Sequence, residues 1–104
     1  MNLFKVILSA DLEPIFRVYP VSCRETNKVF VVSFKDRDDT LISRNIPKPD
    51  LFKVVKKGWQ YVVYCEEKDI HETKEKLKRQ MEIDIQKEID FLTFKLLKVQ
   101  ILKP

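Results

Sequence analysis

Few side chains in this sequence could act in catalysis. His71 is the only histidine, and the two cysteines, Cys23 and Cys65, lie in apolar, strand-like runs. A metal site needs three or four ligands close together, and a nucleophile paired with histidine needs a third group that orients the base. We interpret His71 as a solvated residue near a helix start and both cysteines as reduced, buried thiols. The sequence therefore predicts no catalytic residue, no cofactor, no metal site and no enzymatic activity.

Acidic residues form one short cluster. Asp36, Asp38 and Asp39 surround Arg37. Their carboxylates could bind a divalent cation, but the spacing lacks the glycine and the distal glutamate of an EF-hand loop. We interpret the cluster as a hydrophilic hairpin tip.

Basic residues gather between residues 44 and 57, where Asp50 is the only acidic residue. They are Arg44, Lys48, Lys53, Lys56 and Lys57. Trp59, Tyr61 and Tyr64 follow directly, and proteins that bind single-stranded nucleic acid combine positive charge along the backbone with rings that stack on bases. A structural interpretation stands beside this one, in which the aromatic residues are core and the lysines keep a proline-rich loop soluble. Nucleic-acid binding is the second of two functions that the sequence favours.

The longest regular pattern lies in the C-terminal third. Neither proline nor glycine occurs from Asp69 until Pro104, and apolar residues recur there at steps of three or four. This stripe consists of Leu77, Met81, Ile85, Ile89, Leu92, Leu96 and Val99. The spacing predicts one long helix over about residues 69–98 whose stripe packs on the core. Alternation of apolar and polar residues over 97–102 leaves open a strand at the end.

A second apolar face lies opposite the stripe on this predicted helix. It consists of Ile83, Phe91, Phe94, Leu97 and Ile101. A small domain cannot easily bury both sides of one helix, so this far face is the predicted protein interface. The first function that the sequence favours is therefore a small, non-enzymatic accessory protein. It acts as a protein-interaction module whose C-terminal helix contacts another protein or a second copy in a homodimer.

Strand-like runs precede the helix and must position these residues. They cover about residues 3–9, 15–23, 28–35, 40–46 and 59–65, with short polar turns between most of them. Pro20 cannot donate a ladder hydrogen bond, so its strand should lie at an edge or bend there. We predict an α+β fold with about five antiparallel strands in a bent sheet or small open barrel over residues 3–65. The long helix follows within a single domain of residues 1–104, whose β-rich part is 1–66 and whose helical part is 69–104.

Composition excludes other classes of protein. The net charge is +4, and the single glycine excludes glycine-rich phosphate loops. No apolar run approaches the ~20 residues that span a bilayer, and the first residues do not form a signal peptide. We expect a cytoplasmic protein with no membrane partner and no small-molecule substrate.

The order of the parts carries one resemblance. The segments RNIPKPDLFKV and GWQYVVYCEEKDIHETKEKLKRQM, within about residues 44–81, resemble small uncharacterised proteins from phages and mobile elements of low-GC bacteria. Those proteins pair a β-rich part with a lysine- and glutamate-rich helix. The resemblance implies an accessory or host-directed protein, and it contains no catalytic motif from which a site residue could be carried over.

Overall fold

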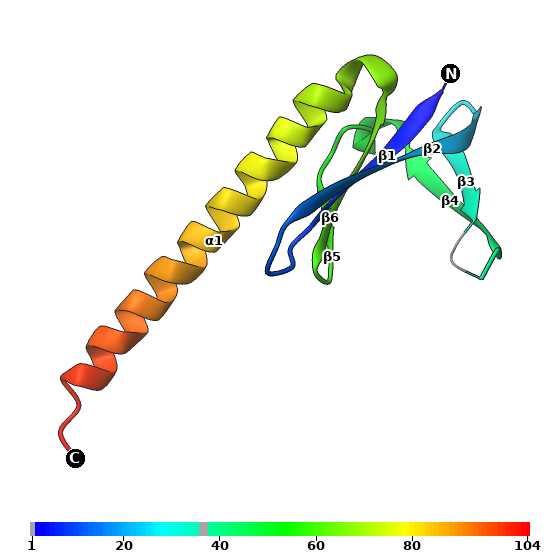
Figure 1. Cartoon of the computed structure of the whole chain (residues 1–104). Helices are drawn as coiled ribbons and strands as arrows, with labels where there is room; N and C mark the ends of the chain where they lie inside the picture. Colours follow the sequence, from blue (N-terminus) through cyan, green and yellow to red (C-terminus); the bar gives the residue numbers. More distant parts are fainter. Residues whose placement is uncertain (1, 36–37) are drawn as a thin grey trace.

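The computed structural model describes residues 2–35 and 38–104, so Asp36 and Arg37 of the predicted hairpin tip lie outside the described residues. Six strands precede one long helix (Figure 1). The strands are β1 (Leu3–Ser9), β2 (Ile15–Glu25), β3 (Val29–Lys35), β4 (Leu41–Pro47), β5 (Val55–Lys57) and β6 (Gln60–Glu66), and the helix is α1 (Ile70–Gln100). Short 3₁₀ turns, η1 (Lys48–Asp50) and η2 (Glu67–Asp69), precede β5 and α1. The predicted α+β class is confirmed. The sheet has one strand, β5, in addition to the five expected.

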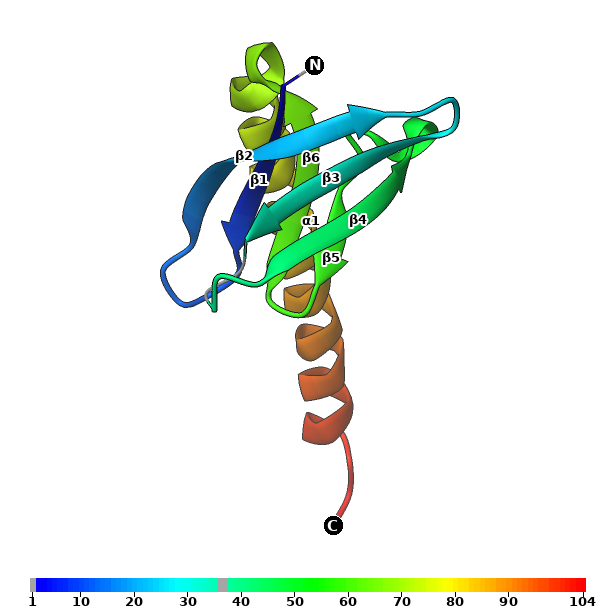
Figure 2. The same ribbon diagram turned by 90° about the vertical axis from the view of Figure 1, so that its right-hand side faces the viewer.

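All six strands belong to one antiparallel, curled sheet with the order β4-β3-β2-β1-β6-β5. The long strand β2 joins its two halves (Figure 2): its first part pairs with β1 as far as Val21, and β3 takes over from Ser22. The change of partners comes one residue after Pro20, whose missing donor predicts a bend near this point. Because β2 turns from one partner to the other, β3 and β4 curl away from the helix.

Each face of the curled sheet carries its own apolar cluster, because side chains alternate between the faces of a strand. On the outer face, α1 covers β1 and β6, and the buried residues are Val6, Leu8, Tyr61, Val63, Cys65, Leu77 and Met81. On the inner face, the buried residues are Leu3, Val21, Phe30, Val32 and Ile46. The sheet therefore has two cores, and α1 contributes to only one of them.

The helix packs on the sheet through its first turns alone. Its buried residues are Thr73, Leu77 and Met81, whereas Ile85 is 47% and Val99 59% exposed. The prediction that the whole stripe packs on the core is therefore wrong for Ile85, Ile89, Leu92, Leu96 and Val99. The reason is length: the 31 residues of α1 extend about 46 Å, and the seven-residue strands β1 and β6 extend only about 23 Å.

The sequence leaves open whether residues 97–102 form a strand or continue the helix. Residues 97–100 remain helical, and the backbone N–H of Ile101 donates to the carbonyl of Leu97 at 3.2 Å. The alternating pattern of residues 97–102 therefore does not form a strand.

Candidate functional site

The C-terminal part of α1 extends away from the rest of the molecule (Figure 1). We call residues 83–102 the protruding segment. The radius of gyration is 18.0 Å, whereas a compact domain of this length has about 13 Å. The long dimension of 61 Å is more than twice the other two, 29 and 24 Å. Beyond the contact of Asp84 with the sheet, this shape leaves the protruding segment without a covering surface in the single chain.

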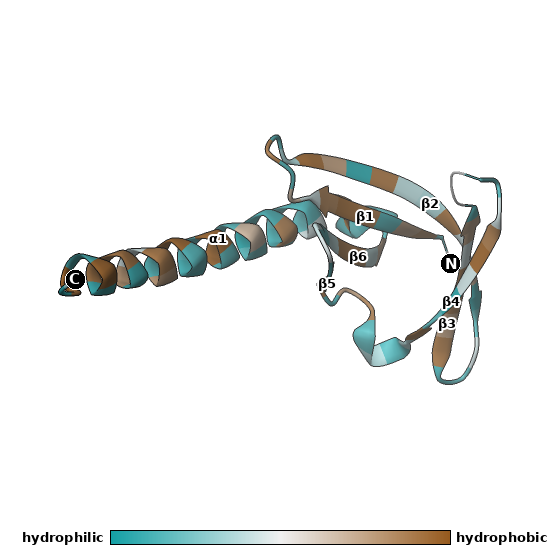
Figure 3. Cartoon of the chain, turned by 90° about the horizontal axis from the view of Figure 1, so that it is seen from below, coloured by the Kyte–Doolittle hydropathy of each residue, from teal (hydrophilic) through white to brown (hydrophobic). Residues whose placement is uncertain are grey.

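Large apolar side chains are exposed on both sides of this segment. They are Ile83, Ile85, Ile89, Phe91, Leu92, Phe94, Leu96, Leu97, Val99, Ile101 and Leu102. Hydrophobic residues recur along α1 toward its C-terminal end in Figure 3. Exposed apolar side chains that lie next to one another mark an interaction site. The protruding segment is the candidate functional site of this chain.

One hydrogen bond marks where the packing of α1 on the sheet ends. The hydroxyl of Tyr61 on β6 donates to Oδ2 of Asp84 at 2.8 Å, and Gln80 Nε2 donates to Oδ1 of the same carboxylate at 3.1 Å. Burial and the Asp84 bond raise the pKa of Tyr61 to about 12. The Tyr61 bond holds the pKa of Asp84 below its usual value. Both shifts favour a neutral Tyr61 beside an ionised Asp84, and the hydrogen bond ties this turn of α1 to β6.

The exposed part of the stripe has the spacing of a coiled-coil seam. From Ile85 to Val99 the apolar residues follow each other at steps of four, three, four and three. Steps that alternate in this way repeat every 3.5 residues, the period with which two helices stay in contact along a shared seam. The residues before Ile85 follow each other at steps of four instead. The change of period therefore coincides with the end of the contact between α1 and the sheet.

The far face predicted as an interface is exposed as well. Phe94 is 60% exposed, and the other four predicted residues, Ile83, Phe91, Leu97 and Ile101, are also exposed. Lys98 Nζ lies 5.1 Å from the centre of the Phe94 ring. The exposure of this face is consistent with an interface, and its contact with a partner stays a prediction.

The five basic residues of the predicted nucleic-acid surface differ in their contacts. Lys48 pairs with Glu25 at 2.8 Å and Lys53 with Asp50 at 3.0 Å. Lys56 Nζ lies 5.5 Å from the centre of the Tyr61 ring. Arg44 and Lys57 remain, and they line the inner face of the sheet together with Lys53.

The three aromatic residues near this basic segment differ in exposure. Trp59 is 77% exposed in the turn between β5 and β6, whereas Tyr61 is only 2% exposed and Tyr64 is half-buried. Only Trp59 is therefore open enough to stack on a base as the nucleic-acid hypothesis requires. That hypothesis stays a prediction, and Tyr61 has no part in it.

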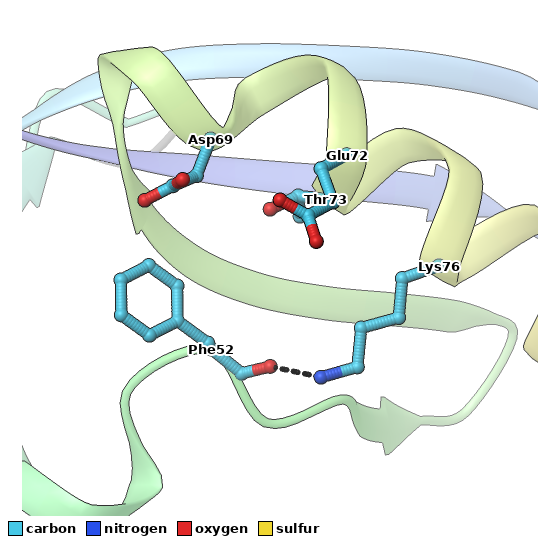
Figure 4. Close-up of a pocket in the computed structure, with 5 residues that line it drawn as sticks. All are labelled: Phe52, Asp69, Glu72, Thr73 and Lys76. Carbon is cyan, nitrogen blue, oxygen red and sulfur yellow. Dashed lines mark hydrogen bonds between the residues drawn. The ribbon is translucent and has the colours of Figure 1, made fainter.

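A cavity of about 260 Å³ lies beside the first turns of α1 (Figure 4). Asp69, Glu72, Thr73 and Lys76 line it from the helix side, and Phe52 lines it from the opposite loop. Lys76 Nζ donates to the Phe52 carbonyl at 2.7 Å.

Phe52 has φ of 70°, a conformation that costs a bulky residue energy unless neighbours hold it. Its carbonyl accepts the bond from Lys76, and its N–H donates to the Tyr64 carbonyl at 3.1 Å. These two bonds fix the loop between η1 and β5 and so place Asp50 and Lys53 at the rim of the inner face.

The residues suited to chemistry remain apart. His71 is exposed and lies 3.3 Å from Glu75, measured from Nε2 to Oε1. Within residues 2–35 and 38–104, no group of three or more His, Cys, Asp or Glu side chains is placed to hold a metal ion. No helix in the described part of the chain combines the length and the apolar character needed to cross a bilayer.

No protein-family model matches this chain, and neither does any curated protein or solved structure with which it was compared.

Proposed function

We propose that this chain is a non-enzymatic protein-interaction module whose protruding segment is the contact surface. The observation that carries the proposal is the exposure of large apolar side chains on both sides of residues 83–102. Exposed apolar area on this scale favours burial against another surface, since each square ångström removed from water contributes about 25 cal/mol. The small, two-core sheet then serves as a base that presents the helix.

The partner that fits the stripe best is a second copy of the chain. Ile85, Ile89, Leu92, Leu96 and Val99 form five consecutive seam positions, and two copies of one helix offer the same period to each other. In an antiparallel pair centred between residues 90 and 91, Ile85 meets Leu96 of the second copy and Ile89 meets its Leu92. Such an isologous contact has two-fold symmetry and closes as a dimer.

Charges beside the seam favour the antiparallel arrangement. Glu88 and Lys95 flank the same side of the stripe. In the antiparallel register, each Glu88 lies beside Lys95 of the other copy, so two opposite-charge pairs form. In a parallel pair, Glu88 would lie beside Thr93 and Lys95 beside Gln100, and neither contact pairs opposite charges. Flanking charges of this kind set the orientation of coiled-coil helices.

Hydrogen exchange at different protein concentrations tests the proposal. A helix segment without tertiary contacts opens readily, so the amides of residues 85–100 should exchange fast in the dilute protein. Association at higher concentration should slow their exchange by about tenfold or more, because each 1.4 kcal/mol of added stability is a factor of ten. Residues 73–81, which pack on the sheet, serve as the internal control and should exchange at the same rate at every concentration. Equal exchange of residues 85–100 at low and high concentration would contradict the proposal.

A further inference from the structure

Three cationic side chains converge on the inner face of the curled sheet. Lys5 is on β1, Arg44 on β4 and Lys57 on β5. Lys5 lies opposite Tyr64 of β6 in the ladder, and Arg44 lies opposite the buried Val32 of β3. The curl of the sheet brings its two edge strands, β4 and β5, toward each other across this face, and a cavity of about 210 Å³ lies between them.

Polar and apolar groups share the lining of this inner cavity. Arg44, Lys57 and Tyr64 supply hydrogen-bond donors, and Ile46, Val55 and Val62 supply an apolar surface. Asp50 also lines the cavity, and its carboxylate is already paired with Lys53 at 3.0 Å. The remaining lining residues therefore offer positive charge beside an apolar wall.

The cations repel one another instead of pairing with acids. Burial lowers the pKa of Lys5, and the positive charges of Arg44 and Lys57 lower it further. The same Arg44 charge opposes the rise in the pKa of Tyr64 that burial causes. Among the described residues, no carboxylate lies within ion-pair distance of Lys5, Arg44 or Lys57.

Lys5 is held on this face by an aromatic ring. Its Nζ lies 4.3 Å from the centre of the Phe34 ring, a distance at which the ring face attracts a cation. This contact holds the half-buried ammonium on the inner face, where the charges of Arg44 and Lys57 still reach it. Strand residues supply all three cations, so the sheet sets the positions of their backbones on this face.

We propose that this inner cavity binds a phosphate group through Arg44 and Lys57, with Lys5 adding positive charge beside it. Phosphate fits better than a carboxylate because a phosphate monoester carries about −1.5 to −2 charges at neutral pH. Two cations that are unpaired in the described part of the chain, Arg44 and Lys57, line the cavity, and Lys5 adds positive charge from the neighbouring part of the same face. The guanidinium of Arg44 can bind two phosphate oxygens at once, and the ammonium groups act as point charges. Val55 and Val62 lie where they would contact the body that carries the phosphate. This site goes beyond the interaction helix and does not depend on it.

Two sources could present such a phosphate: a free phosphate ester or a nucleic-acid strand. The probes are inorganic pyrophosphate, adenosine monophosphate and an oligothymidylate, each titrated at low salt into the isotope-labelled full chain and followed by NMR. The expected result is saturable shifts of the amides near residues 5, 44, 57 and 64. An oligothymidylate that binds tighter, with a log–log salt slope near −0.7 per contacted phosphate, identifies a strand as the source. Equal affinity for adenosine monophosphate and the oligomer identifies a free ester.

Charge removal shows whether the cavity itself binds. The double variant Arg44→Gln/Lys57→Gln should lose about tenfold or more in affinity for whichever probe binds, since hydrogen bonds between charged groups are lost. Lys48→Gln is the matched control, because Lys48 is already paired with Glu25, and its affinity should stay within about twofold. Arg44 and Lys57 are exposed and Lys48 is partly exposed, so an unchanged amide spectrum away from the substituted residues verifies the fold. No binding of any probe, or an equal loss in Lys48→Gln, would overturn the proposal.

Discussion

Leu92→Glu should convert the associated protein into a folded monomer. Leu92 is exposed in the single chain and lies in the middle of the seam, opposite Ile89 of the proposed second copy. Each dimer of the variant would bury two uncompensated carboxylates, and an unpaired buried charge costs roughly 3 kcal/mol or more, which corresponds to at least about a 100-fold loss of affinity. Size-exclusion chromatography with light scattering measures the change in mass, and near-ultraviolet circular dichroism shows whether the sheet is intact.

Phe94→Glu is the matched control on the far face of the same helix. The antiparallel seam leaves this face uncovered, so the Phe94→Glu protein should keep the mass of the wild-type assembly. If Phe94→Glu gives the monomer and Leu92→Glu does not, the interface lies on the far face and the seam is wrong. If Leu92→Glu unfolds the sheet, the stripe beyond Met81 belongs to the core, and the description of residues 83–102 as exposed in the single chain is wrong.

Leu77→Ala and Ile85→Ala should differ sharply in their effect on stability. Leu77 is fully buried between α1 and the sheet, so its truncation leaves a cavity and should lower the free energy of unfolding by about 2–5 kcal/mol. Ile85 is two turns further along the stripe but exposed, and its truncation should cost less than about 1 kcal/mol in a monomer. Both variants are made in the Leu92→Glu background, so that association adds nothing to the result. Urea denaturation followed by circular dichroism gives the two values.

Either of two outcomes would contradict these expected losses of stability. A loss of more than about 2 kcal/mol for Ile85→Ala in the monomer would mean that the side chain is buried after all. A loss below about 1 kcal/mol for Leu77→Ala would mean that α1 does not pack on the sheet through its first turns.

The elements of the fold could be predicted because each one has a local signal. The alternating run of residues 59–65 predicts β6, with Trp59, Tyr61, Val63 and Cys65 on one face. The last three are buried against the helix, whereas Trp59 precedes β6 and is exposed. β5 was missed because Val55–Lys57 is only three residues long and two of them are lysines. Its position comes from pairing with β6, which no local pattern shows.

The surface that covers the helix could not be predicted from the spacing of its apolar residues. The stripe from Leu77 to Val99 shows which side chains need a partner surface, and periodicity is the same whether that surface is a sheet or another helix. Strand length decides between a sheet and another helix, because the contact with β6 reaches Asp84 and the stripe from Ile85 onward is about half exposed or more. A comparison of the expected helix length with the lengths of the strands would have shown that the helix is too long for the sheet to cover.

The inner cavity was only partly accessible to sequence reasoning. Arg44 and Lys57 were singled out, but they were grouped with Lys48 and Lys53, which pair with acids. Lys5 was missed because only the curled sheet brings it close to residues so far along the chain. A signal did exist, since Lys5 is the one charged residue in the otherwise apolar run of β1.

Sedimentation equilibrium of the wild-type chain tests the central claim most directly. In our proposal, a second copy of the protein covers the stripe from Ile85 to Val99 in solution. We expect the average mass to rise from the monomer value of 12.4 kDa toward twice that value as the protein concentration increases through the micromolar range. A mass that stays at the monomer value up to high micromolar concentration would contradict self-association through this helix.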